Sequence, residues 1–130
     1  MVTEDRLLPV LEQLKRREPL LHRRGLVGSV PDVYRETAED YWEVGASGQR
    51  YSREYVVATL RERFESGGRD AYEAEGWELT DFLLREIAPA TYLLTYTLRQ
   101  PDRLTRRLTV WQGSEPTGWK IHYHQGTVVT

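Results

Sequence analysis

The chain contains no cysteine, and this absence removes several classes of function at once. Disulfide bonds, thiolate metal sites and cysteine nucleophiles are all excluded. A chain without cysteine also fits the reducing cytoplasm, where disulfides are rare. We therefore expect a cytoplasmic protein, and no motif in the sequence indicates a cofactor.

Long hydrophobic runs are also missing. The chain opens with Met-Val-Thr-Glu-Asp-Arg, and no apolar stretch long enough for a signal peptide or a membrane span follows. The 18 basic and 20 acidic residues give a formal net charge of −2, too close to neutral for electrostatic binding of nucleic acid. We therefore expect neither a membrane nor a nucleic acid among its partners.

Phenylalanine is scarce, with two residues against four Trp and eight Tyr. Trp and Tyr combine an apolar ring with one polar group, which suits a partly hydrated cavity or an interface. At 130 residues the chain is long enough to bury one core, so we expect a single domain over residues 1–130.

Helical patterns fill much of the first half of the chain. Leucines recur at helical spacing in the first helix, which Glu18-Pro19 ends or kinks. Ser29 is placed to cap a second helix that runs to about Asp40, and Ser52 is placed to cap a third. A short strand over 41–44 lies between these two helices.

The second half is rich in β-forming residues. Strands are expected over 77–87 and 91–99, followed by a closing hairpin over 104–127 with its loop at 113–118. Helices followed by antiparallel strands form the α+β pattern. We expect about three N-terminal helices packed on a curved, mostly antiparallel sheet, with a ligand cavity between them. Residues 66–75 are the expected mobile loop.

The closing hairpin predicts which side chains share a face. If Gln112 pairs with Trp119, strict alternation separates two sets of residues. The first set is a packing face: Leu108, Val110, Trp119, Ile121 and Tyr123. The second is a polar and aromatic face: Arg107, Thr109, Trp111, His122 and His124. Because both faces carry large aromatics, we expect a homodimer packed through the sheet.

Three motifs resemble one known superfamily. They are Asp40-Tyr41-Trp42-Glu43-Val44-Gly45-Ala46-Ser47-Gly48 with Tyr51-Ser52-Arg53-Glu54, then Trp77-Glu78-Leu79-Thr80-Asp81-Phe82, and the ending Gly118-Trp119-Lys120-Ile121-His122-Tyr123-His124-Gln125-Gly126-Thr127. Together with the order of elements, they resemble the NTF2-like (SnoaL-like, cystatin-type) superfamily, and more narrowly its DUF4440 group of uncharacterised bacterial proteins. The resemblance implies an α+β cone whose cavity binds a small organic ligand.

The same resemblance implies two candidate catalytic residues. The proton-abstracting aspartate of the superfamily's ketosteroid isomerases falls at Glu43, and the histidine of the polyketide cyclases' Glu-His-Trp-Asp motif falls at His124. The isomerase's tyrosine on the first helix has no counterpart here, and the cyclase's acidic residue falls at Gly126. Independently of the resemblance, Glu43 stands among aromatic residues, and desolvation there would raise its pKa toward the range of acid–base catalysis.

Six further residues are expected to bind the ligand: Tyr41, Tyr96, Arg107, Trp111, His122 and Gln125. No metal site is predicted, because His122 and His124 lack a third ligand and His22 lies far away in the sequence. Glu43 could instead form a structural ion pair with Arg107. An isomerase, cyclase or hydratase, a non-catalytic ligand-binding protein and a protein-interaction (docking) module therefore all stay open, since one fold can host each of them.

Overall fold

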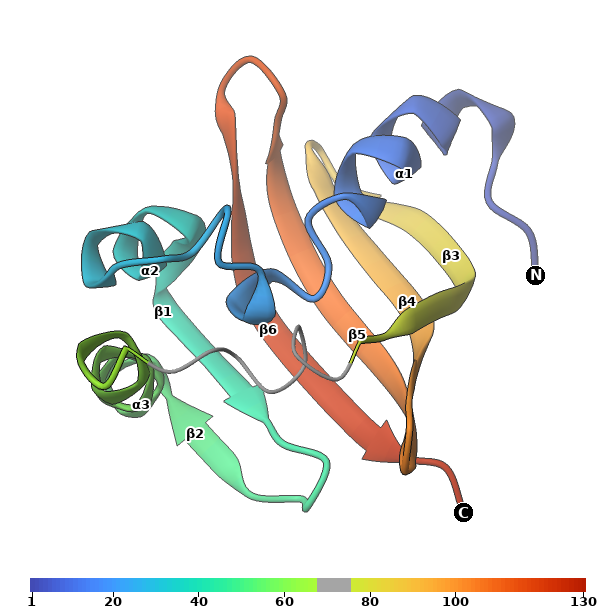
Figure 1. Ribbon diagram of the computed structural model, residues 1–130. Helices are drawn as coiled ribbons and strands as arrows, with labels where there is room; N and C mark the ends of the chain where they lie inside the picture. The colour runs from blue at the N-terminus through green and yellow to red at the C-terminus, as the bar shows by residue number, and fades with distance from the viewer. Residues whose placement is uncertain (68–75) are drawn as a thin grey trace.

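The computed structural model describes residues 1–67 and 76–130, with helices on one side of a single sheet (Figure 1). The helical elements are η1 (Asp5–Leu7), α1 (Leu8–Lys15), η2 (Leu20–His22), α2 (Val30–Glu36) and α3 (Arg53–Glu65). The strands are β1 (Thr37–Val44), β2 (Arg50–Ser52), β3 (Glu78–Ala88), β4 (Thr91–Gln100), β5 (Arg103–Ser114) and β6 (Gly118–Val128). The α+β class is confirmed. Most of the expected loop over 66–75 lies outside the described residues.

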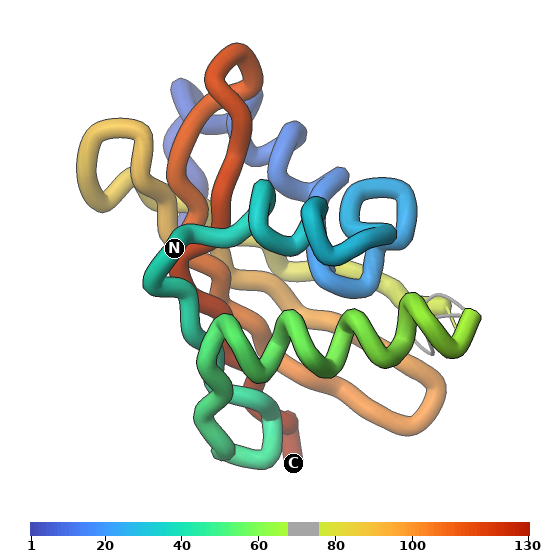
Figure 2. Tube along the Cα trace, turned by 90° about the vertical axis from the view of Figure 1, so that its left-hand side faces the viewer, coloured from blue at the N-terminus to red at the C-terminus, as the bar shows by residue number. Residues whose placement is uncertain are grey.

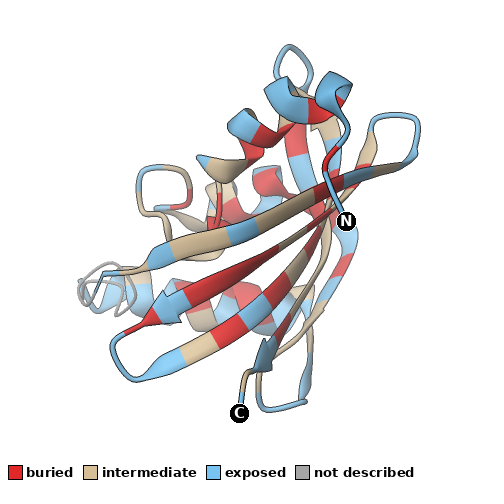
Figure 3. Ribbon diagram, turned by 90° about the vertical axis from the view of Figure 1, so that its right-hand side faces the viewer, coloured by how far each residue is buried: buried red, intermediate tan, exposed pale blue. Residues whose placement is uncertain are grey.

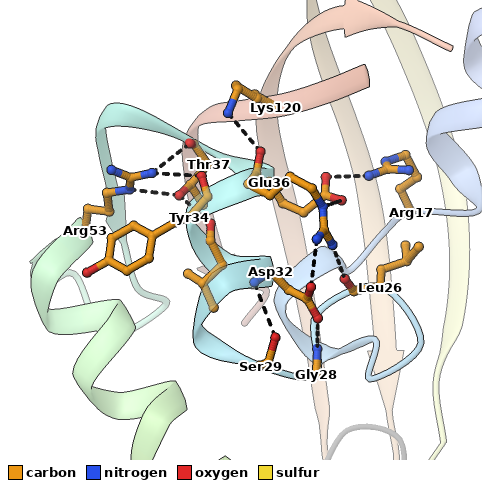
Figure 4. Close-up of polar contacts among 12 residues, drawn as sticks. Arg17, Leu26, Gly28, Ser29, Asp32, Tyr34, Glu36, Thr37, Arg53 and Lys120 are labelled. Carbon is orange, nitrogen blue, oxygen red and sulfur yellow. Dashed lines mark hydrogen bonds and ion pairs between the residues drawn. The ribbon is translucent and has the colours of Figure 1, made fainter. Parts of the chain in front are cut away.

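The sheet has the strand order β2-β1-β6-β5-β4-β3. Its neighbouring strands are antiparallel except for β1 and β6, which are parallel, so the sheet is mixed. The strand β1 begins at Thr37, whereas the sequence predicted that α2 would continue to about Asp40. The Thr37 hydroxyl donates to the Val33 carbonyl at 2.6 Å, and Arg53 binds both the hydroxyl and the carbonyl of Thr37 (Figure 4). These contacts hold the chain where the helix stops and the strand starts.

Both predicted helix caps are present. The Ser29 hydroxyl accepts a hydrogen bond from the backbone N–H of Asp32 at 3.4 Å, and Ser52 accepts one from that of Tyr55 at 3.1 Å. The capped helix α3 lies alongside β1 and β2 at one edge of the sheet (Figure 2). Among the described residues, no helix is long and apolar enough to cross a membrane.

The core lies between the helices and the inward-facing residues of the sheet. Residues along the strands alternate in burial over much of their length, as Figure 3 shows. The sheet contributes the fully buried Leu94, Leu98 and Trp111, and the helices contribute Leu14, Val33 and Leu60. The inner face of the sheet therefore packs on all three α-helices, and the opposite, outer face carries none of these helices.

The hairpin formed by β5 and β6 does not have the predicted register. Gln112 pairs with Lys120 rather than with Trp119, which pairs with Gly113. Gly113 and Gly118 both have a positive φ, and a Cβ on Gly113 would overlap the Gly118 carbonyl oxygen. The two glycines therefore extend the strands into the predicted six-residue loop and shift the pairing.

A β-bulge in this hairpin then reverses the side-chain pattern. The pairing shifts between Val110–Tyr123 and Trp111–Ile121, so His122 is an extra residue in β6. One extra residue moves every later side chain of the strand to the opposite face. The predicted separation into a packing face and a polar face is therefore wrong. The helix-facing side combines members of both sets: Arg107, Thr109, Trp111, Trp119, Ile121 and His124.

Candidate functional site

Two adjoining hollows lie between the sheet and the helices, and both are lined by Leu21, His22 and Glu43. The outer hollow, of about 270 Å³, is bounded by β2 and α3. The inner hollow, of about 50 Å³, lies against the sheet. Five polar residues line the inner hollow besides His22 and Glu43: Glu18, Tyr41, Arg107, Thr109 and His124. The outer hollow is close to the lower end of the range for small-molecule sites, about 300–1,000 Å³.

Glu43 reaches the hollows because of its place in β1. Alternation along the strand turns Tyr41 inward, where it is 2% exposed, and Trp42 outward, where it is 48% exposed. Glu43 follows Tyr41 on the inner side, and the Tyr41 hydroxyl donates to Glu43 Oε1 at 2.7 Å. Across the parallel pair of strands, Glu43 lies opposite His124. The two predicted catalytic residues are therefore neighbours.

The Glu43 carboxyl is perturbed by its surroundings. Burial raises its pKa, while the hydrogen bond from Tyr41 and the positive charges of Arg107 and Arg63 oppose the rise. The pKa of Tyr41 is raised well above its ordinary value, first by burial and then by the negative charge of Glu43. Tyr41 is therefore a neutral donor at physiological pH, and Glu43 is the group whose charge can change.

His124 is held by a hydrogen bond on one edge of its ring. Its Nδ1 lies 2.8 Å from the Thr109 hydroxyl, its Cα partner on β5. Burial lowers the pKa of His124 to about 3, and the charges of Arg107 and His22 add to the effect. The imidazole is consequently neutral at physiological pH. It can accept or donate a hydrogen bond, but it carries no positive charge.

Glu18 is the site residue that the sequence interpretation missed. Its side chain is 1% exposed, accepts the Tyr96 hydroxyl on Oε1 at 2.8 Å and accepts Trp111 Nε1–H on Oε2 at 2.9 Å. The Thr109 hydroxyl is a third hydrogen-bond partner. Burial raises the pKa of Glu18, and these three bonds oppose the rise. The only local signal was a carboxylate beside Pro19 and two leucines, which indicates the end of a helix as readily as a buried site.

The structure sorts the predicted site residues into three groups. Tyr41, Glu43, Arg107 and His124 line the inner hollow. Tyr96 and Trp111 are not lining residues of either hollow, but both bind the carboxyl of Glu18, which lines the inner one. The other two predicted residues, His122 and Gln125, are not among the residues that line either hollow.

The bulge explains why His122 and Gln125 lie elsewhere. As the extra residue of the bulge, His122 binds the exposed Gln112 side chain through Nε2 at 2.7 Å. Gln125 pairs with Leu108 on the outer face and accepts a hydrogen bond from the Tyr123 hydroxyl. His22, which the sequence placed far from the site, lines both hollows because η2 folds back over the sheet. Among the described residues, no group of three or more His, Asp or Glu side chains is arranged to hold a metal ion.

A larger groove, of about 690 Å³, lies elsewhere, between α1, α2 and the β5–β6 hairpin. Four of its charged side chains, Arg17, Arg35, Glu36 and Lys120, already have polar partners within the protein, and Figure 4 shows these contacts. Arg17 pairs with Glu36 at 2.5 Å, Arg35 pairs with Asp32 at 2.8 Å, and Lys120 donates to the Arg35 carbonyl at 2.9 Å. These contacts join α1 and β6 to α2. The groove is therefore a weaker candidate for a ligand site than the two hollows at Glu43.

Solved structures with a similar fold cover almost the whole chain. An NTF2-like protein from Cytophaga hutchinsonii matches with a TM-score of 0.64 and 16% identity, over 98% of this chain and 100% of that chain. A DUF3225-family protein of unknown function from Pectobacterium atrosepticum gives 0.66 and 16%, over 98% and 94%. A protein from Parabacteroides distasonis, named as a ketosteroid isomerase candidate, gives 0.64 and 14%, over 99% and 96%.

No protein-family model and no curated protein matches the chain. At identities of 14–16%, the structural likeness shows the fold and nothing about activity. The narrower resemblance to the DUF4440 group stays a prediction. The chain has the NTF2-like, cystatin-like α+β fold that its motifs predicted.

Proposed function

We propose that this protein binds a small organic molecule in the outer and inner hollows, which together form the cone cavity of the fold, and that Glu43 acts on that molecule. The observation that carries the proposal is the position of the Glu43 carboxyl. It borders both hollows, and the Tyr41 hydroxyl holds it at 2.7 Å. A carboxyl with a raised pKa in such a place is suited to take up or release a ligand proton.

The reaction class that fits these groups is proton transfer, as in an isomerase, a cyclase or a hydratase. Tyr41 orients the carboxyl, and the buried Arg107 guanidinium supplies positive charge where a substrate oxygen could become negative. His124 adds an uncharged hydrogen-bonding group. The name of the Parabacteroides distasonis protein, a ketosteroid isomerase candidate, belongs to the same class. We also retain the cytoplasmic location that the cysteine-free sequence predicted.

The test replaces Glu43 with Gln, which keeps the shape of the side chain and removes its charge. A ligand-observed NMR screen of small carbonyl compounds first identifies a molecule that binds the wild-type protein. We expect Glu43→Gln to weaken that binding at least tenfold, about 1.4 kcal/mol, with a thermal midpoint equal to or above that of the wild type. Glu39→Gln is the matched control, because Glu39 is an exposed carboxylate of the same strand.

The outcomes separate two of the three functions that the sequence left open, an enzyme and a ligand-binding protein. Weakened binding together with turnover of the bound compound supports an enzyme, and weakened binding without turnover supports a ligand-binding protein. A strongly destabilised Glu43→Gln with unchanged affinity would mean that Glu43 is half of a structural ion pair, and the proposal would fail.

A second copy of the chain is the partner that we propose, packed through the outer face of the sheet. An apolar row crosses four neighbouring strands there: Leu93, Val110, Tyr123 and Trp42. The Trp42 and Tyr123 rings lie 4.9 Å apart, and Trp42 remains 48% exposed. An aromatic and aliphatic row of this kind on a helix-free face favours self-association.

Sedimentation at micromolar concentration tests this partner. We expect the wild-type protein to sediment at about twice the monomer mass and Val110→Arg to sediment as a monomer, because a charge would be buried in the interface. Leu8→Arg is the control, since Leu8 is 45% exposed on α1, away from the outer face. A wild-type monomer would remove the dimer and leave the ligand site unaffected.

A further inference from the structure

The Thr109 hydroxyl lies between two groups that compete for its single proton. One is His124 Nδ1, at 2.8 Å, and the other is the Glu18 carboxyl. A threonine hydroxyl donates one hydrogen bond and accepts others, so it can donate to His124 or to Glu18 but not to both. The direction of the Thr109 bond therefore decides which nitrogen of His124 carries the ring proton.

The other partners of Glu18 determine this direction. Trp111 Nε1–H can only donate, so Glu18 Oε2 must accept at 2.9 Å, and the Tyr96 hydroxyl lies 2.8 Å from Oε1. Burial raises the pKa of Glu18, while its three hydrogen bonds and the positive charge of Arg107 oppose the rise. Trp111 and Tyr96 donate to its two oxygens, and the Glu18 carboxyl accepts from Thr109 as well. The Thr109 oxygen is then left to accept a hydrogen bond from His124 Nδ1–H.

We propose that Glu18, acting through Thr109, is a positioning residue that holds neutral His124 as its Nδ1–H tautomer. The Nε2 atom, on the ring edge away from Thr109, then carries a lone pair, and His124 lines the inner hollow next to Glu43. A ligand that binds there meets a hydrogen-bond acceptor at His124, so the site favours molecules that present a hydroxyl or an N–H group. This preference rests on the proposed function, whereas the tautomer itself does not.

The tautomer can be measured in the free protein at neutral pH. Two-bond ¹H–¹⁵N correlation spectra distinguish a protonated ring nitrogen from an unprotonated one. The chain has three histidines, so spectra of His22→Gln and His122→Gln assign the signals of His124. We expect a protonated Nδ1 and an unprotonated Nε2. A protonated Nε2, or two tautomers in exchange, would overturn the inference.

Variants of Thr109 test the connection to Glu18. Thr109→Val keeps the shape of the side chain and removes the hydroxyl, so we expect His124 to change to the Nε2–H tautomer, which free imidazole side chains prefer. Thr109→Ser keeps a hydroxyl and should preserve Nδ1–H. Thr97→Val is the control, because it removes a buried hydroxyl that binds Asp81 on the neighbouring strand instead. An unchanged tautomer in Thr109→Val would show that Glu18 does not act through Thr109.

The result of the tautomer measurement does not depend on whether the proposed function is correct. No ligand is present, and Glu43→Gln should leave the His124 tautomer unchanged. If His124 is the Nδ1–H tautomer but no compound binds in a way that depends on Glu43, the role of Glu43 is rejected and the positioning role of Glu18 remains.

Discussion

Trp111→Phe is the substitution that most directly tests the buried Glu18 centre. Trp111 is fully buried, and its Nε1–H donates to Glu18 Oε2 at 2.9 Å. Phenylalanine keeps a ring in the same place and removes the donor. Trp119 offers a matched control, because it is 7% exposed on the same face and its ring lies 6.3 Å from that of Trp111. Within residues 1–67 and 76–130, Trp119 makes ring contacts but no hydrogen bond to a carboxyl group.

The difference between the two variants isolates the hydrogen bond. Each Trp→Phe change removes the same ring atoms, so the packing losses largely cancel. A hydrogen bond to a charged group contributes about 1.5–3 kcal/mol to the free energy of unfolding. That contribution is lost when a buried acceptor is left without its donor. We therefore expect Trp111→Phe to lower the free energy of unfolding by about 1.5–3 kcal/mol more than Trp119→Phe.

Urea unfolding followed by circular dichroism measures both variants without relying on tryptophan fluorescence. The excess loss in Trp111→Phe should shrink as the pH falls, because a protonated Glu18 accepts weaker hydrogen bonds. The sign follows from linkage: the bond from Trp111 opposes the raised pKa of Glu18, so its loss raises that pKa further. The folded variant then loses stability more steeply as the pH rises. Equal losses in the two variants at neutral pH would refute the reasoning.

Two further predictions concern the bulge and Glu43. Ile121→Ala should lower the free energy of unfolding by about 2–5 kcal/mol, because Ile121 is a buried core residue. His122→Ala should cost less than about 1 kcal/mol, because its only described hydrogen bond is to the exposed Gln112, and comparable losses in urea would mean that the bulge is wrongly placed. The raised pKa of Glu43 contributes stability that is complete below its unfolded pKa, about 4.3, and is lost as the pH rises through the folded pKa. Glu43→Gln should therefore gain thermal stability relative to the wild type as the pH rises from about 4, and a difference that does not change with pH would contradict the assigned pKa shift.

Features that depend on a few neighbouring residues could be predicted from the sequence. The caps at Ser29 and Ser52 are such features, because a hydroxyl and an N–H three residues later meet within one turn. The α+β class follows from the order of helical and strand patterns. The inward direction of Glu43 in β1 follows from alternation next to the buried Tyr41.

Features that depend on pairing between distant segments could not be predicted. The extra residue at His122 belongs to the pairing of β5 with β6, and no period within β6 reveals it. Strict alternation therefore placed Tyr123 on the helix side and assigned His122 to the site. Asp81, with a φ of 60°, interrupts β3 where its register with β4 shifts, and the sequence showed this only as imperfect alternation.

The sequence by itself determined the local elements, the fold class and Glu43 as a candidate residue, but it did not identify Glu18. Only the tertiary structure brings Tyr96 and Trp111 to Glu18, across 78 and 93 positions of the chain. Burial removes water from a carboxyl, and the donors that replace water come from strands far away in sequence. The partners of a buried carboxyl are known only once the strands of the sheet have assembled. For that reason the cluster of Glu18, Tyr96 and Trp111 was visible only in the tertiary structure.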